Sequence, residues 1–229
     1  MQFSVARESL LKPLQMISGV VEKRQTLPIL SNVLISLRDS ELSLTGTDLE
    51  VELAGKIKVD NSSSGGEITV PARKLFDICK SLPDNSLIEI FVNENKCLVN
   101  SGRSKFSLMT LPAAEFPKVV EEHENLSFNL QQAKLKGLIE ATSFAMAQQD
   151  VRYYLNGMLF EIAHQTLKLV ATDGHRLAMS ELTLDGLESD RQIILPRKGI
   201  LEMSRLLSDG NEDITLSLGQ NQIRASMSE

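Results

Sequence analysis

The chain has 229 residues, of which 42% are hydrophobic and 24% are charged, and its formal net charge is −6. This length suits two domains of common size, and the composition is that of a folded globular protein. No apolar run is long enough to span a membrane, and residues 1–4 lack the layout of a secretion signal, so we expect a cytoplasmic protein.

Motifs for cofactors and metals are absent from the sequence. There is no Cys-x-x-Cys pair, no Walker-type loop and no Gly-x-Gly-x-x-Gly, and the three histidines are scattered. Cys79 and Cys97 lie in different predicted elements, which favours reduced thiols over a disulfide or a metal site. We therefore expect no cofactor and no metal.

Apolar periodicity predicts short strands interrupted by two helices in the first half of the chain. The predicted elements are strand 3–5, helix 9–21, strands 32–37, 41–45 and 49–59, a flexible loop 61–66, strand 67–70, helix 71–82, and three short strands ending at residue 111. The polar and acidic residues 120–125 are predicted to form a linker between a domain 1–124 and a domain 125–229.

The second half repeats the pattern of the first at an offset of 125 residues. Phe3 corresponds to Phe128, Pro71 to Pro196, and the pair Thr47-Asp48 to Thr172-Asp173, with a slip of about one residue near Ile214. Its predicted elements are strand 126–130, helix 132–147, strands up to residue 184, loop 185–190, strand 192–195, helix 196–207 and two strands. Duplicated units in series favour a curved or ring-like assembly.

The second copy is shorter than the first. It has 104 residues, and the part equivalent to residues 105–117, which includes the end of a predicted strand, is missing. A domain without its closing strand has an open edge. We therefore expect this chain to be a fragment of a longer protein.

Positive charge is concentrated in the predicted helices. Segments 6–24, 71–82, 131–147 and 196–208 hold twelve basic and five acidic residues, so they carry +7 and the remainder of the chain carries −13. Since the four helices occupy equivalent positions, we expect them to share one face of a continuous sheet and to make that face positive. Electrostatic attraction to phosphate is local, so an acidic protein can still bind DNA without reading its sequence. The alternative is that these cations only solvate exposed helices.

Six motifs are specific enough for comparison with a known family. They are Thr26-Leu27-Pro28-Ile29-Leu30, Leu42-Ser43-Leu44-Thr45-Gly46-Thr47-Asp48-Leu49-Glu50, Val70-Pro71-Ala72-Arg73-Lys74, Asp150-Val151-Arg152-Tyr153-Tyr154-Leu155-Asn156-Gly157, Ala171-Thr172-Asp173-Gly174-His175-Arg176-Leu177-Ala178 and Leu195-Pro196-Arg197-Lys198-Gly199. Together they resemble the bacterial replicative sliding clamp, the beta subunit of DNA polymerase III.

The resemblance implies an α+β fold, the DNA clamp fold of duplicated (βαβββ)2 domains, with helices on the inner face and antiparallel sheets outside. Members of the family have three such domains per chain, and two chains close head to tail into a homodimer ring around double-stranded DNA. The ring tethers polymerase for processive synthesis and breaks no bond itself. The chain stops at Glu229, within the second domain, so we expect that it does not close a ring.

The resemblance also assigns three sets of residues. DNA contacts are expected at Arg24, Arg73, Gln149, Tyr153, Tyr154, Arg197 and Lys198. A pocket for a short hydrophobic peptide of DNA polymerases and clamp-loader subunits is expected at Leu155, Thr172, Gly174, His175, Arg176 and Leu177, and to be incomplete in this chain. A dimer edge is expected at Lys74, Arg103, Lys105, Phe106 and Leu108.

Two alternatives belong to other functional classes. Asp173 and His175 could act as the acid–base pair of a hydrolase or a nucleotide-binding enzyme, but the sequence shows no nucleophile or third orienting group beside them. The first copy lacks the equivalents of Gly174, His175 and Arg176, so the fold does not need them and a role in a site is favoured. A two-domain scaffold that never contacts DNA is the other alternative.

Overall fold

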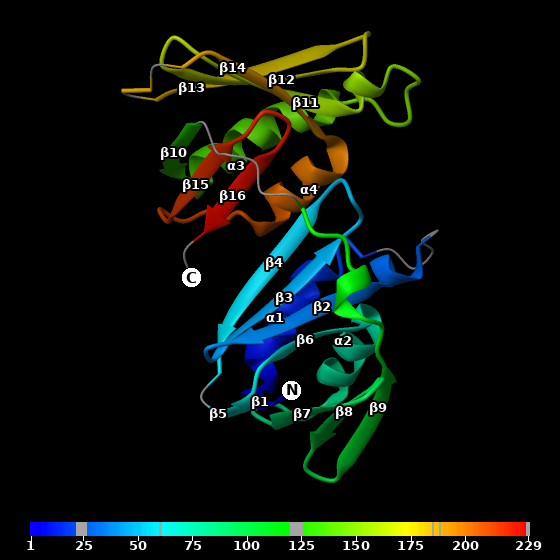
Figure 1. Ribbon diagram of the computed structural model, residues 1–229. Helices are drawn as coiled ribbons and strands as arrows, with labels where there is room; N and C mark the ends of the chain where they lie inside the picture. Colours follow the sequence, from blue (N-terminus) through cyan, green and yellow to red (C-terminus); the bar gives the residue numbers. More distant parts are fainter. Residues whose placement is uncertain (22–26, 60, 120–125, 185, 188, 228–229) are drawn as a thin grey trace. The chain divides into compact units, whose positions relative to one another are not determined.

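The structure, a computed structural model, describes residues 1–21, 27–59, 61–119, 126–184, 186–187 and 189–227. The chain divides into two compact units, Met1–Val119 (unit 1) and Val120–Glu229 (unit 2) (Figure 1). The predicted linker 120–125 and the predicted boundary between residues 124 and 125 lie outside the described residues.

The described residues of unit 1 form two antiparallel sheets and two α-helices. Its sheets have the strand orders β4-β3-β2-β6 and β5-β1-β7-β8-β9, and α1 packs against α2, β3 and β4. The core between these layers includes Phe3, Leu10, Ile35 and Leu75, all of them buried. The elements are β1 (Gln2–Ala6), α1 (Arg7–Ile17), η1 (Pro28–Ser31), β2 (Asn32–Arg38), β3 (Glu41–Thr47), β4 (Glu52–Lys58), β5 (Asn61–Ser64), β6 (Gly66–Pro71), α2 (Ala72–Ser81), β7 (Leu87–Asn93), β8 (Lys96–Ser101), β9 (Ser104–Met109) and η2 (Ala113–Glu115).

Unit 2 repeats this arrangement. Its sheets have the orders β13-β12-β11-β14 and β10-β15-β16, and α3 and α4 pack against the first of them (Figure 1). Leu135, Phe160, Leu169 and Ile200 are among the buried core residues. The elements are β10 (Leu126–Gln131), α3 (Gln132–Thr142), η3 (Ser143–Ala145), η4 (Tyr153–Leu155), β11 (Gly157–Ala163), β12 (Thr166–Thr172), β13 (Leu177–Thr183), β14 (Arg191–Pro196), α4 (Arg197–Leu206), β15 (Asp213–Leu218) and β16 (Ile223–Met227).

The predicted duplication is confirmed element by element. The bounds of α1 and α3, of β2 and β11, of β3 and β12, and of α2 and α4 differ by 125 residues at both ends. The start of β7 at Leu87 and of β15 at Asp213 shows the expected slip of one residue. Strand pairing is repeated as well, since Leu34 faces Thr69 in unit 1 and Leu159 faces Ile194 in unit 2.

Four predictions about elements need correction. The single continuous sheet is wrong, because each unit has two separate sheets. Residues 61–66 were predicted to be a flexible loop, but Asn61–Ser64 form β5, which pairs with the outer edge of β1. Helix 9–21 is wrong at both ends, since α1 begins at Arg7 and ends at Ile17, where Ser18 donates its hydroxyl back to the Gln15 carbonyl. Helix 132–147 similarly ends at Thr142, whose hydroxyl donates to the Leu138 carbonyl.

None of the helices in the described part of the chain is both long and apolar enough to cross a membrane.

Candidate functional site

The four α-helices hold ten basic and four acidic residues, although the whole chain is acidic. Three of the ten cations are held in ion pairs with carboxylates. Lys136 lies 2.7 Å from Asp209, and Arg205 lies 2.6 Å from Glu202. The hydrogen bond to Asp209 is the largest cause that raises the pKa of Lys136. These pairs reduce the positive surplus on the helices but do not remove it.

Arg7, the third of these cations, has a structural role that the sequence did not indicate. Its side chain is 11% exposed, its Nε donates to the Cys79 carbonyl at 2.9 Å, and its Nη1 lies 2.7 Å from Asp84. Cys79 is in the last turn of α2, so Arg7 joins the start of α1 to the end of α2. A side chain committed in this way is not available for an external phosphate.

Five other helix cations are exposed and form no ion pair with a described residue. They are Lys12, Arg73, Lys74, Lys80 and Lys134. Arg73 and Lys74 are in the first turn of α2, and Lys80 is in its last turn. Such side chains can bind an anionic ligand without first breaking an ion pair with a described residue. Arg24 lies outside the described residues.

Residues 146–156 form a loop of unit 2 that is attached to the start of α4. The Ala147 amide donates to the Leu155 carbonyl at 3.0 Å, and the Arg197 amide donates to the Asn156 carbonyl at 2.9 Å. Nη1 of Arg197 also donates to the Met146 carbonyl at 3.3 Å. The loop that carries the exposed Gln149, which has a φ of 57°, is therefore joined to the first turn of α4, where Arg197 and Lys198 lie.

The two tyrosines of the chain extend from the same loop. Tyr153 and Tyr154 are 83% and 50% exposed, and their rings meet edge to face with centroids 6.0 Å apart. This degree of exposure argues against a role of the two rings in core packing. Exposed rings with hydroxyls can stack on bases or donate to phosphates.

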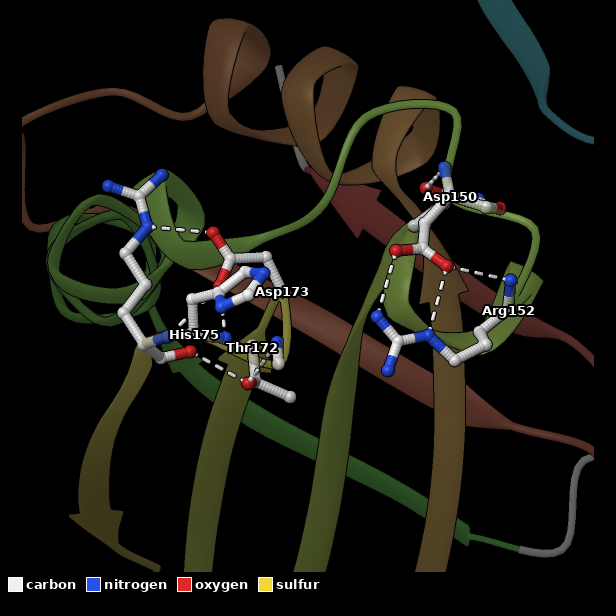
Figure 2. Close-up of polar contacts among 8 residues, drawn as sticks. Asp150, Arg152, Thr172, Asp173 and His175 are labelled. Atoms are coloured by element: carbon white, nitrogen blue, oxygen red, sulfur yellow. Dashed lines mark hydrogen bonds and ion pairs between the residues drawn. The ribbon is translucent and has the colours of Figure 1, made fainter.

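The turn between β12 and β13 is organised by Thr172 and Asp173 (Figure 2). The Thr172 hydroxyl accepts from the Gly174 amide at 3.1 Å and donates to the Arg176 carbonyl at 2.7 Å. Asp173 accepts from the backbone amides of His175 at 2.9 Å and Arg176 at 3.0 Å. These amide bonds are the main cause that lowers the pKa of the Asp173 carboxyl. The result is a rigid loop that presents His175 to solvent.

A second turn, organised by Asp150, lies beside the first (Figure 2). Arg152 donates to Asp150 from its Nε and Nη2, both at 3.0 Å, and Asn156 donates to the Asp150 carbonyl at 2.8 Å. The Arg152 side chain is the first cause that lowers the pKa of Asp150, to about 2. A Cβ placed on Gly174 would lie 3.2 Å from Nη2 of Arg152, so the two turns are in contact at that glycine.

The predicted peptide-pocket residues come from three neighbouring elements of unit 2. Leu155 ends η4 and is only 8% exposed, whereas Leu177 begins β13 and is 65% exposed. Arg176 spans the gap toward α3, since its Nη2 donates to the Phe144 carbonyl at 2.6 Å and its guanidinium lies 5.5 Å from the centre of the Phe144 ring. Phe144 is itself 57% exposed.

Phe144 and Arg152 are contact residues of the site that were not among the predicted site residues. Arg152 was within a quoted motif, so its position next to Tyr153 could have marked it. Phe144 had no such signal, because its contact with Arg176 spans 32 positions and depends on the fold.

The predicted dimer edge is gathered on one side of unit 1. β9 is the outermost strand of its sheet, so its backbone is open to pairing on one side. A recess of about 480 Å³ separates it from α2 and is lined by Lys74, Asp77, Ile78, Lys105, Phe106, Ser107 and Leu108. Arg103 is exposed in the turn before β9.

The geometry does not favour the acid–base alternative. Asp173 accepts the backbone amide of His175, and the Thr172 hydroxyl is committed to the Arg176 carbonyl. No group of three or more His, Cys, Asp or Glu side chains that could hold a metal ion occurs among the described residues. An exposed turn with these commitments lacks an activated nucleophile.

Comparison with known proteins identifies the family. The family description "DNA polymerase III beta subunit, N-terminal domain" matches residues 1–120, and "DNA polymerase III beta subunit, central domain" matches residues 129–229. The chain belongs to the DNA polymerase III beta subunit family. The beta sliding clamp of Pseudomonas putida is 59% identical over 100% of this chain, and that of Escherichia coli K12 is 50% identical over 98%.

Solved beta subunits share the fold. The crystal structure of the Pseudomonas aeruginosa beta subunit matches 99% of this chain with a TM-score of 0.96 at 57% identity, and that of Caulobacter crescentus matches all of it with a TM-score of 0.92 at 34% identity. A Pseudomonas aeruginosa clamp has been solved bound to griselimycin, and a Caulobacter crescentus clamp with polyethylene glycol at a putative beta-motif tethering region. The chain spans 63% of the length of the Pseudomonas putida clamp and 62% or 63% of each of these solved chains.

Proposed function

We propose that this chain supplies two domains of a non-catalytic sliding clamp that encircles double-stranded DNA in the cytoplasm and tethers replication proteins to it. Family membership supports the class of protein. The observation that carries the DNA part is the concentration of exposed cations such as Arg73 and Lys80, which form no ion pair with a described residue, on α-helices of an acidic chain.

The DNA contacts in this proposal are weak and independent of sequence. Lys and Arg side chains attract phosphates through charge, and Gln149, Tyr153 and Tyr154 can add neutral hydrogen bonds. A closed ring leaves DNA only at its ends, so it needs no strong contact to stay bound. Weak contacts also let it slide. The proposed DNA residues remain Arg24, Arg73, Gln149, Tyr153, Tyr154, Arg197 and Lys198.

The peptide site in this proposal takes a short hydrophobic segment of a DNA polymerase or clamp-loader subunit. The exposed Leu177 supplies apolar contact area, and the two aspartate-organised turns hold His175, Arg176 and Gly174 in fixed positions around it. Sites of this kind bind through apolar anchors with a few polar contacts. The griselimycin-bound relative supports the idea that clamps of this family accept a ligand.

The homodimer contact in this proposal is the edge of β9. An unpaired strand edge offers backbone donors and acceptors, and Phe106 and Lys105 border the adjoining recess. A complementary strand of a second chain could pair there and close the ring.

Duplex binding at several salt concentrations tests the DNA part of the proposal. We expect fluorescence anisotropy to show binding to duplexes of unrelated sequence that weakens as salt rises. Replacing Arg73 and Lys80 together by alanine should make the slope of log affinity against log salt less steep by roughly 0.9 for each phosphate that is no longer neutralised, about 2 in total. The matched control replaces Lys58 and Lys96, exposed cations on β4 and β8, and should leave the slope unchanged. Equal effects of both pairs, or no salt-sensitive binding, would favour the scaffold alternative.

A further inference from the structure

The first strand of unit 2, β10, lies at the edge of its sheet and leaves one side of its backbone unpaired. The sheet has the order β10-β15-β16, and no strand in the described part of the chain pairs with the outer side of β10. The Gln132 amide, just after β10, donates to the Glu212 carbonyl, just before β15, at 2.9 Å. Because alternate residues of an antiparallel strand direct their backbone groups to opposite sides, every second residue counted back from Gln132 bonds to β15. The residues between them direct their amides and carbonyls to the open edge: Ser127, Asn129 and Gln131.

In unit 1 the equivalent edge is covered by β5, which pairs with β1 (Figure 1). Ser4, which corresponds to Asn129 at the offset of 125 residues, faces Asn61 of β5. Since β5 is antiparallel to β1, its amino-terminal end lies toward the end of β1 that leads into α1. Unit 1 therefore shows the direction and the register that a strand takes on this edge.

The segment of unit 2 that corresponds to β5 follows another path. The two units still agree just before it, where the Val59 amide donates to the Ser40 carbonyl at 2.9 Å. The equivalent Leu184 amide donates to the Gln165 carbonyl at 2.7 Å. The Leu187 amide then turns back to the Leu184 carbonyl at 3.4 Å, and the described residues of this turn do not pair with β10.

A cavity of about 510 Å³ lies beside the open edge of β10. It is bordered by the edge itself, by the end of β13 and by the turn that follows β13. Its apolar lining residues are Phe128, Leu130, Leu182, Leu184 and Leu187. The volume is within the range of about 300–1,000 Å³ that is common for ligand pockets. The edge from Ser127 to Gln131 spans roughly 14 Å at about 3.4 Å per residue, which gives room for an extended segment of four or five residues.

One end of the cavity carries a positive charge. Lys134 lines it from the first turn of α3, is exposed and forms no ion pair with a described residue. In the direction that β5 takes in unit 1, the amino-terminal end of an added strand reaches this end of β10. Asp213 also lines the cavity, but β10 separates it from an added strand, because Asp213 faces Gln131 from β15. The cavity therefore favours an acidic side chain at the amino-terminal end of its occupant.

We propose that this cavity is a second docking site for a partner protein, which adds an extended segment as a strand to the open edge of β10. The segment runs antiparallel to β10, exchanges backbone hydrogen bonds with Ser127 and Asn129, lays an aliphatic side chain on the leucine wall and places an acidic side chain near Lys134. In this mode of recognition, main-chain hydrogen bonds give affinity and side-chain contacts give specificity. The cavity and Leu177 lie at opposite ends of β13, about 20 Å apart along the strand, so the inference does not depend on the proposed peptide pocket or DNA contacts.

The test adds a synthetic peptide to the 229-residue chain and measures amide hydrogen exchange by NMR. The peptide is capped at both ends, alternates valine and threonine, and carries an aspartate at its amino-terminal end. At millimolar peptide we expect exchange at the Ser127 and Asn129 amides to slow by roughly tenfold or more, because a paired amide exchanges only through opening. The Phe128 amide, which already points to β15, should not change. Unchanged exchange at Ser127 and Asn129 would overturn the proposal.

Controls make the test specific. The same peptide methylated on its backbone nitrogens cannot donate to the edge and should give no protection. Lys134→Glu should weaken binding of the aspartate peptide several-fold and strengthen binding of a peptide with lysine in its place. Lys80→Glu, the same charge change on α2, should leave both affinities unchanged.

Two results without peptide would also overturn the proposal. Exchange at Asn129 as slow as at Ser4, which β5 covers, would mean that the chain already covers the edge of β10 itself. Protection of Asn129 that rises with protein concentration would mean that a second copy of the chain occupies the edge.

Discussion

At the scale of single residues, the Thr-Asp pair builds the same turn in both units. Asp48 accepts the amides of Glu50 and Val51 just as Asp173 accepts those of His175 and Arg176. Unit 1 achieves this with Leu49 at a φ of 80°, where unit 2 has Gly174 at 88°. Leu49 shows that glycine is not required for this turn. What distinguishes Gly174 is its contact with Arg152.

Gly174→Ala should therefore destabilise unit 2. The added methyl group meets the Arg152 guanidinium, and the left-handed backbone disfavours any Cβ, for a total cost of about 1–2 kcal/mol. Gly137→Ala is the matched control, because Gly137 lies in α3 with nothing within 4 Å of its Cβ position. The control should stabilise the protein by about 0.5–1 kcal/mol. Urea denaturation measures the change in stability of both variants. Equal changes of the same sign would contradict the contact between Gly174 and Arg152.

The Asp150 carboxylate should contribute a distinct acid dependence. Its pKa in the folded chain is about 2, against an ordinary value of 3.8, chiefly because Arg152 hydrogen-bonds to the ionised form. Its stabilisation is therefore fully present above about pH 4 and is lost as pH falls through 2. Asp150→Asn should lower stability at pH 6, and the difference from the parent chain should shrink as pH falls toward 2. A difference that stays constant from pH 6 to pH 2 would argue against this pair.

At the scale of elements, the two helices of each unit are joined by equivalent residues of different chemistry. Arg7 bonds to the end of α2 with its guanidinium, whereas Gln132, at the same position of α3, accepts the Ser208 amide beyond α4 at 2.9 Å. The mostly buried Arg7 charge has four acceptors and is harder to replace than a neutral amide.

Arg7→Met should thus cost unit 1 about 1.5–3 kcal/mol, the range for hydrogen bonds to a charged group. Methionine keeps the apolar stem, so the decrease in stability reports mainly on the bonds to Cys79 and Asp84. Lys12→Met, on the exposed side of the same helix, should change stability by less than about 0.5 kcal/mol. Thermal denaturation compares the stabilities of the two variants. If Arg7→Met decreased stability as little as Lys12→Met, the connection between α1 and α2 through Arg7 would be weak.

Most elements could be predicted from the sequence, because apolar periodicity is a local property that burial in the core preserves. β5 could not be predicted from the sequence, because residues 61–64 are rich in serine. They form a strand because they pair with the free edge of β1. The division into two sheets per unit was missed for the same reason: pairing partners depend on the whole fold. Helix ends were displaced where Ser18 and Thr142 bond back to the preceding turn.

At the scale of the whole molecule, charge is distributed by element type. The α-helices hold ten basic and four acidic residues within a chain of net charge −6. This partition was predicted from the sequence. The ion pairs of Arg7 with Asp84 and of Lys136 with Asp209 could not be predicted, because these partners lie in loops more than 70 residues along the chain. The prediction that the four helices share one positive face stays a prediction.

The site residues could be chosen from the sequence only through the family motifs. The contacts of these residues could not be predicted, because Arg152 contacts Gly174, and Arg176 contacts Phe144, through loops that only the fold brings together. A substitution at Phe144 should accordingly act on the peptide site.

Phe144→Ala should weaken binding of a hydrophobic clamp-binding peptide several-fold in a clamp that binds it. The physical reason is that the substitution removes the cation–π interaction that holds the Arg176 guanidinium, which is worth roughly 0.5–1 kcal/mol. Isothermal titration calorimetry measures the effect, and unchanged affinity would mean that Asp173 and the backbone carbonyl of residue 144 hold Arg176 without the aromatic ring.

The most direct test of the central claim, that DNA meets the helix cations and not the strand cations, is lysine acetylation with and without duplex DNA, read by mass spectrometry. At low salt the account predicts slower acetylation of Lys12, Lys80 and Lys134 on α1, α2 and α3, with no change at Lys58 and Lys96 on β4 and β8. Raising the salt should abolish the protection. Protection of the strand lysines equal to or greater than that of the helix lysines would contradict the account.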